Sequence, residues 1–480
     1  MAIVRNTFMS FLRLVPLIAS FLAATSCSGG FFDKMDDTPS QLEAVDLGLP
    51  SGTLWASQNL DATHNWDLGG CFAWGETQKK NGSVGYSFLV DGALTAYNFD
   101  QSLGVVDEKY ILEIQDDAAS VILGGNWRIP TKWDCEELYE NCVWEEKIIH
   151  GIRGFLVSSK VNSNSIFIPS YKVTGVIGPI YNYDYWTSCV SSNNYTQAVY
   201  LHPSGKPEFG ECDRRNVCYI RPVLARRAPT EGIAFQSSKI PLTAGTSERV
   251  VIDFTPRDAL DRRIAWTLSD ADVAYIDDNG IVTALYPGTV HLTASTPSGL
   301  SSEAEITVSD FIIPKKVDLG LPSGTLWADR NIGAIQENDD GLKFAWGEVR
   351  PKMLFIQQDY LGPSISSTNY VLASEYDAAT FILGDGWKMP TASDFNELVE
   401  NCDIQYDARH GYYLLTSRSN GGILHLQSVF CWTSTMINHS AIYFHIALTD
   451  NGIQPLFETI HSSYRGHAVR PIYITNKANE

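Results

Sequence analysis

The chain has 480 residues, of which 44% are hydrophobic and 19% charged, a composition typical of folded protein in more than one domain. Its formal net charge is −20 at pH 7, and no run of lysine and arginine interrupts that balance. A phosphate backbone would be repelled over most of the surface, so we expect no nucleic-acid partner.

The first residues have the pattern of a targeting segment. Arg5 and Arg13 accompany the apolar run LVPLIASFLAA, which is too short to span a bilayer, and TSC follows. This pattern predicts a signal peptide over residues 1–26. The stretch AATSC resembles a bacterial lipoprotein signal, which implies lipidation of Cys27. Residues 27–42 would then be a tether to a membrane. Its acidic cluster resembles the surface-export signals of Bacteroidota lipoproteins.

A long block of sequence occurs twice. VDLGLPSGTLWA begins at Val45 and again at Val317, and FAWGE, a W(R/K)(I/M)PT segment, WTS and RP(V/I) follow each copy in the same order. Each copy has the length of a whole domain. The first copy is lengthened by an insertion between Glu76 and Asp116.

The turn and helix-capping residues of each copy predict its local structure. In LPSG the proline and glycine favour a type I turn, so the opening block should form a hairpin with Trp55 on its second strand. Thr131 should cap a helix and Asp134 should reach back to the cap, and Thr391 and Asp394 repeat this pair. Each copy is therefore predicted to be α+β.

These motifs resemble the Fibrobacter succinogenes major paralogous domain family. The resemblance implies a C-type-lectin-like fold for residues 43–228 and 311–476, here called the first and second modules. In that fold the first and last strands pair, which would place Trp55 near Arg221 and Trp327 near Arg470. The arginine would stack on an aromatic ring or pair with the glutamate of FAWGE, Glu76 in the first module.

Residues 229–310 have a different sequence pattern. Short runs alternate apolar and polar residues, with turn signals between them, and Asn279-Gly280 is a strong hairpin signal. The segment resembles the bacterial Ig-like domain, group 2, which implies a spacer or adhesive module. The predicted fold class is thus multidomain, with two α+β C-type-lectin-like domains separated by an all-β immunoglobulin-like sandwich. Short linkers predict three semi-rigidly joined beads in a rod.

The cysteines give one candidate pair. Besides Cys27 there are eight, and only Cys142 and Cys402 are equivalent in the two copies, so most should be free, buried thiols. Cys212 and Cys218, in CDRRNVCYIRP, are the candidate disulfide. This segment loosely resembles the redox cysteines of formylglycine-generating oxidases, which implies a copper-dependent oxidase as an alternative.

No metal, cofactor or catalytic site is predicted. The calcium motif of sugar-binding C-type lectins is absent, and the acidic loop Glu337–Gly341 is better explained by solvation than by Ca²⁺ binding. The aromatic residues of the later strands suit carbohydrate stacking or protein recognition, but a packed core is the favoured interpretation. The ligand-binding residues are not identifiable from the sequence. They should lie where the copies diverge, in the insertion, in CDRRNVC or in the acidic loop.

The expected function is binding without catalysis. The chain would be an outer-membrane lipoprotein, held by its lipid anchor in the cell envelope and exposed at the surface, presenting its modules to an extracellular glycan or protein. A purely structural envelope protein is the other alternative to the oxidase.

Overall fold

The computed structural model describes residues 40–80, 86–172, 183–206, 208–427, 429–450 and 452–474, without the side chains of 171 and 172. The predicted signal peptide, Cys27 and most of the tether lie outside these residues. The chain divides into two compact units, Met1–Ala225 and Arg226–Glu480. Within the described ranges, no helix has the length and apolar character needed to cross a bilayer.

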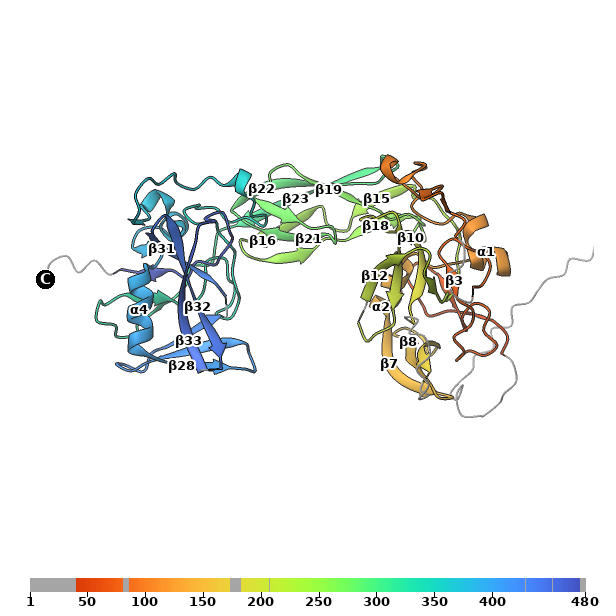
Figure 1. Ribbon diagram of the computed structural model, residues 1–480, viewed down its shortest axis with the longest axis horizontal. Helices are drawn as coiled ribbons and strands as arrows, with labels where there is room; N and C mark the ends of the chain where they lie inside the picture. Colours follow the sequence, from red (N-terminus) through yellow and green to blue (C-terminus); the bar gives the residue numbers. More distant parts are fainter. Residues whose placement is uncertain are drawn as a thin grey trace, which may run out of the picture. The chain divides into compact units, whose positions relative to one another are not determined.

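The first unit contains the first module, drawn from red to yellow in Figure 1. Its strands are β1 (Ala44–Val45), β2 (Leu54–Ala56), β3 (Phe72–Ala73), β4 (Leu89–Val90), β5 (Ala93–Leu94), β6 (Trp127–Arg128), β7 (Cys142–Ile149), β8 (Ile152–Ser159), β9 (Ser165–Lys172), β10 (Tyr185–Val190), β11 (Gln197–His202), β12 (Glu208–Asp213), β13 (Val217–Cys218) and β14 (Val223–Leu224). Its helices are α1 (Ala118–Leu123) and α2 (Lys132–Asn141), with short 3-10 helices η1 (Gln101–Leu103) and η2 (Ile114–Asp116).

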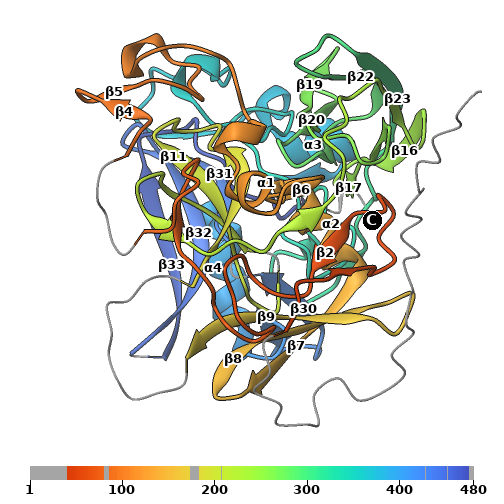
Figure 2. The same ribbon diagram turned by 90° about the vertical axis from the view of Figure 1, so that its right-hand side faces the viewer.

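The opening hairpin and the last strand of this module share one sheet. The strand order is β1-β2-β14-β6, and Trp55 of β2 lies opposite both Val45 and Val223. The predicted hairpin and the predicted pairing of first and last strands are therefore confirmed. Helix α2 begins with the expected capping box of Thr131 and Asp134. Strands β7 and β8 form a long hairpin, seen in yellow in Figure 2.

The second unit contains the sandwich and the second module. The sandwich has strands β15 (Gly232–Phe235), β16 (Lys239–Thr243), β17 (Ser247–Arg249), β18 (Ile252–Thr255), β19 (Ala265–Leu268), β20 (Ala274–Ile276), β21 (Ile281–Ala284), β22 (Gly288–Ser295) and β23 (Ser301–Ser309). They form sheets with orders β16-β23-β22-β19, β17-β21-β20 and β15-β18. Strands β20 and β21 pair antiparallel around Asn279-Gly280, which confirms the predicted hairpin.

The second module repeats the plan of the first. Its strands are β24 (Lys316–Val317), β25 (Leu326–Ala328), β26 (Tyr370–Val371), β27 (Trp387–Lys388), β28 (Cys402–Asp407), β29 (Tyr412–Ser417), β30 (Ile423–Gln427), β31 (Cys431–Ile437), β32 (Ser440–Thr449), β33 (Gly452–Ile460) and β34 (Ile472–Tyr473). Its helices are α3 (Ala378–Leu383) and α4 (Ala392–Asn401), with η3 (Gln357–Asp359) and η4 (Ser374–Tyr376). The order β24-β25-β34-β27 matches β1-β2-β14-β6, and α4 begins with the predicted capping box of Thr391 and Asp394.

The sandwich packs directly on the second module. Leu285 of the sandwich belongs to the same hydrophobic cluster as Ile332, Leu342 and Trp346. Arg350 lies over the ring of Tyr286, with its guanidinium carbon 4.5 Å from the ring centroid. A shared apolar cluster thus connects these two domains in addition to the linker.

One exchange between the copies explains why this contact suits the second module. Gly333 and Leu342 stand where the first module has Asp61 and Gly70. A Cβ atom on Gly333 would overlap the side chain of Leu342, so the glycine makes room for the leucine that faces the sandwich. In the first module Asp61 instead forms an ion pair with Lys79 at 2.7 Å. A polar surface therefore replaces the apolar one.

Candidate functional site

The arginine of the RP(V/I) motif joins the ends of each module. Arg221 is fully buried and donates to Asn59 Oδ1 at 2.7 Å, to the Ala56 carbonyl at 2.9 Å, and to the Phe167 carbonyl. Burial lowers the pKa of Arg221 to about 10, so the guanidinium stays charged at neutral pH. The expected pair with Glu76 is wrong, because Glu76 lies 3.4 Å from Lys80 Nζ.

The tryptophans of the FAWGE and WTS motifs each donate a hydrogen bond to a backbone carbonyl in the other motif's segment. Trp74 of FAWGE donates its indole N–H to the Thr187 carbonyl at 2.9 Å, and Trp186 of WTS donates to the Phe72 carbonyl at 2.8 Å. Trp346 and Trp432 make the same two bonds in the second module, at 2.8 and 2.7 Å. The repeated motifs therefore hold the fold together, which directs attention to the positions where the modules differ.

The candidate cysteine pair is brought together. Cys212 on β12 and Cys218 on β13 are close enough for a thiol–thiol hydrogen bond, which lowers the pKa of Cys212, while burial raises the pKa of Cys218. Both are free thiols in this structure, and the disulfide stays a prediction. The other described cysteines are also free, and most are buried, as expected.

Two carboxylates of the acidic loop bind neighbouring groups of the second module. Asp339 Oδ2 accepts the backbone N–H groups of Ile335 and Gln336 at 3.1 and 2.8 Å, and Glu337 lies 3.1 Å from His425 Nδ1. Among the described residues, no group of three or more His, Cys, Asp or Glu side chains is placed to hold a metal ion.

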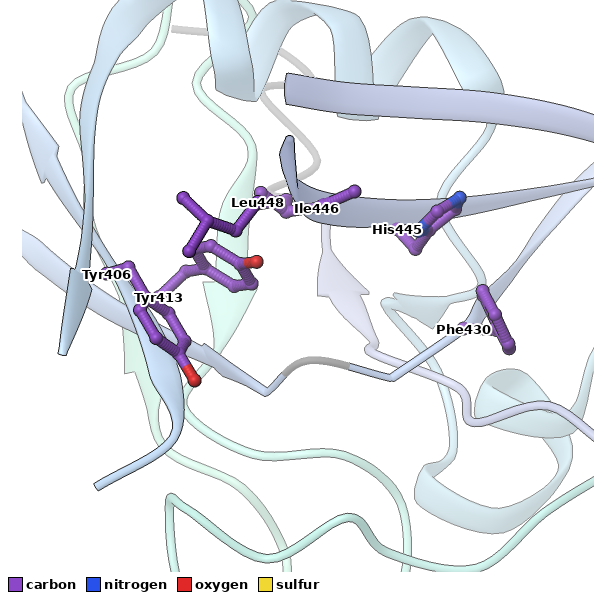
Figure 3. Close-up of a pocket in the computed structure, with 7 residues that line it drawn as sticks. Tyr406, Tyr413, Phe430, His445, Ile446 and Leu448 are labelled. Carbon is purple, nitrogen blue, oxygen red and sulfur yellow. The ribbon is translucent and has the colours of Figure 1, made fainter. Parts of the chain in front are cut away.

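An open cleft lies in the second module between the β28–β29 hairpin and β32. It has a volume of about 340 Å³. Figure 3 shows the rings of Tyr406 and Tyr413 beside Leu448 at one end, and His445 with Phe430 at the other. Its lining consists of Tyr406, Tyr413, Phe430, His445, Ile446, Ala447 and Leu448. The exposed fractions are 37% for Tyr406 and 47% for Phe430, so both rings are open to solvent.

A carboxylate lies next to the His445 end of the cleft. Glu458 Oε1 is 3.3 Å from His445 Nε2, and Tyr443 donates its hydroxyl to Glu458. The hydrogen bonds from Tyr443 and His445 lower the pKa of Glu458, so a negative charge persists at neutral pH. This end of the cleft therefore favours hydrogen-bond donors over anions.

The first module fills the corresponding corner with its own side chains. Tyr139 and Trp144 stack there with ring centroids 3.9 Å apart, and the Tyr139 hydroxyl donates to the Ser204 carbonyl at 3.1 Å. The equivalent positions of these three residues in the second module are Val399, Ile404 and Ala447. Smaller side chains thus accompany the open cleft.

This cleft was not predicted from the sequence. Its signal is the exchange of charged residues for aromatic ones between the copies, since Tyr406 and Phe430 stand where the first module has Glu146 and Asp184. Asp184 Oδ1 lies 2.7 Å from Nδ1 of His202, the equivalent of His445. A position-by-position comparison of the copies could have singled out both aromatic residues, but not the space between them.

A buried histidine behind Phe430 predicts a pH effect on stability. His467 lies 4.3 Å from Trp432 between ring centroids, its Nε2 has no hydrogen-bond partner, and burial lowers its pKa to about 4 from 6.5. In the unfolded chain His467 therefore takes up a proton near pH 6.5, whereas in the folded chain it is protonated only near pH 4. The stability that this difference contributes is complete above pH 6.5 and is lost as the pH falls toward 4.

We expect His467→Phe to reduce the loss of unfolding free energy between pH 7 and about 4.5 by on the order of 2–3 kcal/mol. Urea unfolding at several pH values measures this. His410→Phe is the matched control, because His410 is exposed and lies 2.7 Å from Asp407. Equal pH profiles for the wild type and His467→Phe would contradict the assignment.

Comparison with known proteins identifies the central segment. Residues 229–306 match the family described as bacterial Ig-like domain (group 2), which confirms the predicted sandwich. An uncharacterized protein of Clostridium acetobutylicum is 34% identical over 82 residues, covering 17% of this chain and 21% of the relative. Lacto-N-biosidase of Bifidobacterium bifidum is 32% identical over 80 residues, covering 17% of this chain and 7% of the enzyme. The chain thus spans only a small part of these relatives.

Solved structures give weaker matches. Domains 4 and 5 of the S-layer protein SbsC match with a TM-score of 0.16 and 13% identity, covering 32% of this chain and 90% of that structure. A C-terminal intimin fragment in complex with the intimin-binding domain of its translocated receptor matches with a TM-score of 0.16 and 10% identity, covering 48% and 71%. The C-type-lectin-like assignment of the two modules stays a prediction.

Proposed function

We propose that this chain is a surface-anchored lipoprotein whose modules bind an extracellular glycan or protein and catalyse no reaction. The observation that carries the proposal is the open cleft of the second module, where the exposed rings of Tyr406 and Phe430 lie on an otherwise repeated scaffold. Exposed aromatic residues in a concave site are typical of recognition surfaces. The lipid on Cys27 would hold the chain at the outer membrane.

The arrangement of domains and sites in the chain supports this proposal over the oxidase alternative. The central bacterial Ig-like domain is a spacer rather than a catalytic scaffold in this proposal, and it packs on the module that carries the cleft. The cleft and the pair of Cys212 and Cys218 lie in different modules.

The full chain with Cys27→Ala, which removes the proposed lipid attachment point, should bind a defined subset of glycans on an array or capture one class of protein from the surface of intact cells. Saturable binding that is weakened by the double variant Tyr406→Ala, Phe430→Ala would support the proposal. The variant Arg409→Ala, on the turn between β28 and β29, is the surface control. Blank arrays and blank captures would contradict it and favour a purely structural envelope protein.

A further inference from the structure

We propose that the cleft of the second module binds the terminal hexopyranose of an uncharged glycan. This inference rests on the proposed function and narrows its ligand to one chemical class. It follows from the shape of the cleft, the chemistry of its lining and the charge beside it.

The aromatic rings of the cleft suit a sugar ring. Tyr406 and Phe430 expose 37% and 47% of their surfaces, and Figure 3 places them at opposite ends of the cleft. The C–H groups on a face of a pyranose pack against an aromatic face, which carries a partial negative charge. The volume of about 340 Å³ is at the lower end of the range of roughly 300–1,000 Å³ for small-molecule sites and fits a short saccharide.

The polar groups of the cleft can both donate and accept hydrogen bonds. Tyr406 contributes a hydroxyl from a half-exposed side chain at one end, and His445, which lies 3.3 Å from Glu458 Oε1, contributes an imidazole at the other. The hydroxyls of a sugar are likewise donors and acceptors, whereas an aliphatic side chain offers neither. A polyol is therefore a better match than an apolar peptide anchor.

The charge beside the cleft excludes acidic sugars. None of the lining residues is lysine or arginine, and the Glu458 carboxylate lies 3.3 Å from His445. The chain as a whole carries a formal net charge of −20. A sialic acid or uronic acid would bring a second negative charge to this end of the cleft without a cationic partner. The ligand is thus an uncharged hexose, joined to the rest of the glycan through the open side of the cleft.

The test uses the full chain with Cys27→Ala on an array of oligosaccharides that end in glucose, galactose, mannose or N-acetylglucosamine, with their sialylated counterparts. Calorimetric titration then measures Kd for the best uncharged oligosaccharide. We expect uncharged ends to bind, sialylated counterparts to bind less, and Tyr406→Ala or Phe430→Ala to raise Kd by about tenfold, as the loss of an aromatic contact of this kind can do.

Tyr412→Ala is the matched control. Tyr412 neighbours Tyr413 on β29 and is absent from the cleft lining, and its ring lies 4.9 Å from that of His425 between centroids. This variant should leave Kd unchanged, and far-ultraviolet circular dichroism should show that all three variants fold.

The outcomes separate this inference from the proposed function. Glycan binding that is unchanged in Tyr406→Ala and Phe430→Ala, or that requires a sialylated end, overturns the inference and leaves recognition standing. Capture of a protein together with a blank glycan array does the same. Blank results in both assays overturn the inference and the proposed function together.

Discussion

Replacing Gly245 by alanine should destabilise the unit Arg226–Glu480 by about 2–5 kcal/mol, the sum of backbone strain and overpacking. Gly245 has a φ of +97°, and a Cβ atom there would overlap the backbone of Gly333 where the sandwich meets the second module. Since the clash involves backbone on both sides, no side-chain rotation relieves it. Scanning calorimetry should show a lower melting temperature, and proteolysis should cleave the linker at residues 310–315 faster.

Gly299→Ala is the matched control for this variant. Gly299 also lies in the sandwich with a positive φ, +87°, but a Cβ atom there has open space around it. Its replacement should therefore cost only the backbone strain, about 1–2 kcal/mol, and leave the linker protected. If the two variants behave alike, the packing of the sandwich on the second module does not contribute to stability.

Replacing Arg470 by alanine should cost about 3–5 kcal/mol of unfolding free energy. Arg470 is fully buried and donates to Asn331 Oδ1 at 2.7 Å, to the Ala328 carbonyl at 3.1 Å and to Gln427 Oε1 at 2.6 Å. Alanine would remove the guanidinium donor from these three acceptors and open a cavity among them. Arg470→Lys should also destabilise the unit, because one ammonium cannot reproduce the planar guanidinium geometry.

Urea unfolding measures this effect, with two variants for comparison. Arg418→Ala removes an exposed arginine that lies 2.7 Å from Asp403 and should cost less than about 1 kcal/mol. Arg221→Ala removes the equivalent of Arg470 and should lower the stability of the unit Met1–Ala225 instead. A cost for Arg470→Ala as small as that for Arg418→Ala would refute its role in joining the ends of the module.

Local features of the fold were accessible from the sequence because short-range chemistry decides them. The LPSG turn, the Thr131 and Asp134 capping box and the Asn279-Gly280 hairpin depend on residues at most a few positions apart. The internal repeat also predicted that the second module would share the strand pairing of the first, with β34 beside β25.

The partners of buried polar groups were not accessible in this way. Arg221 was expected to stack on an aromatic face or to pair with Glu76. It instead donates to Asn59 and to the carbonyls of Ala56 and Phe167, and it lies beside the Tyr185 hydroxyl. Every residue has a backbone carbonyl, so the sequence does not show which carbonyls accept hydrogen bonds from a buried arginine. Only the packed strands bring these acceptors together.

The sequence by itself determined the two duplicated modules and the bacterial Ig-like segment between them. It also determined the turns and helix caps of the modules, because these depend on hydrogen bonds between residues close together in the chain. The tertiary structure alone decided the joint between the sandwich and the second module and the position of the cleft. Both depend on side-chain volume, at Gly333 and Leu342 in the joint and at Val399 and Ile404 near the cleft. The effect of these volumes appears only when distant strands pack.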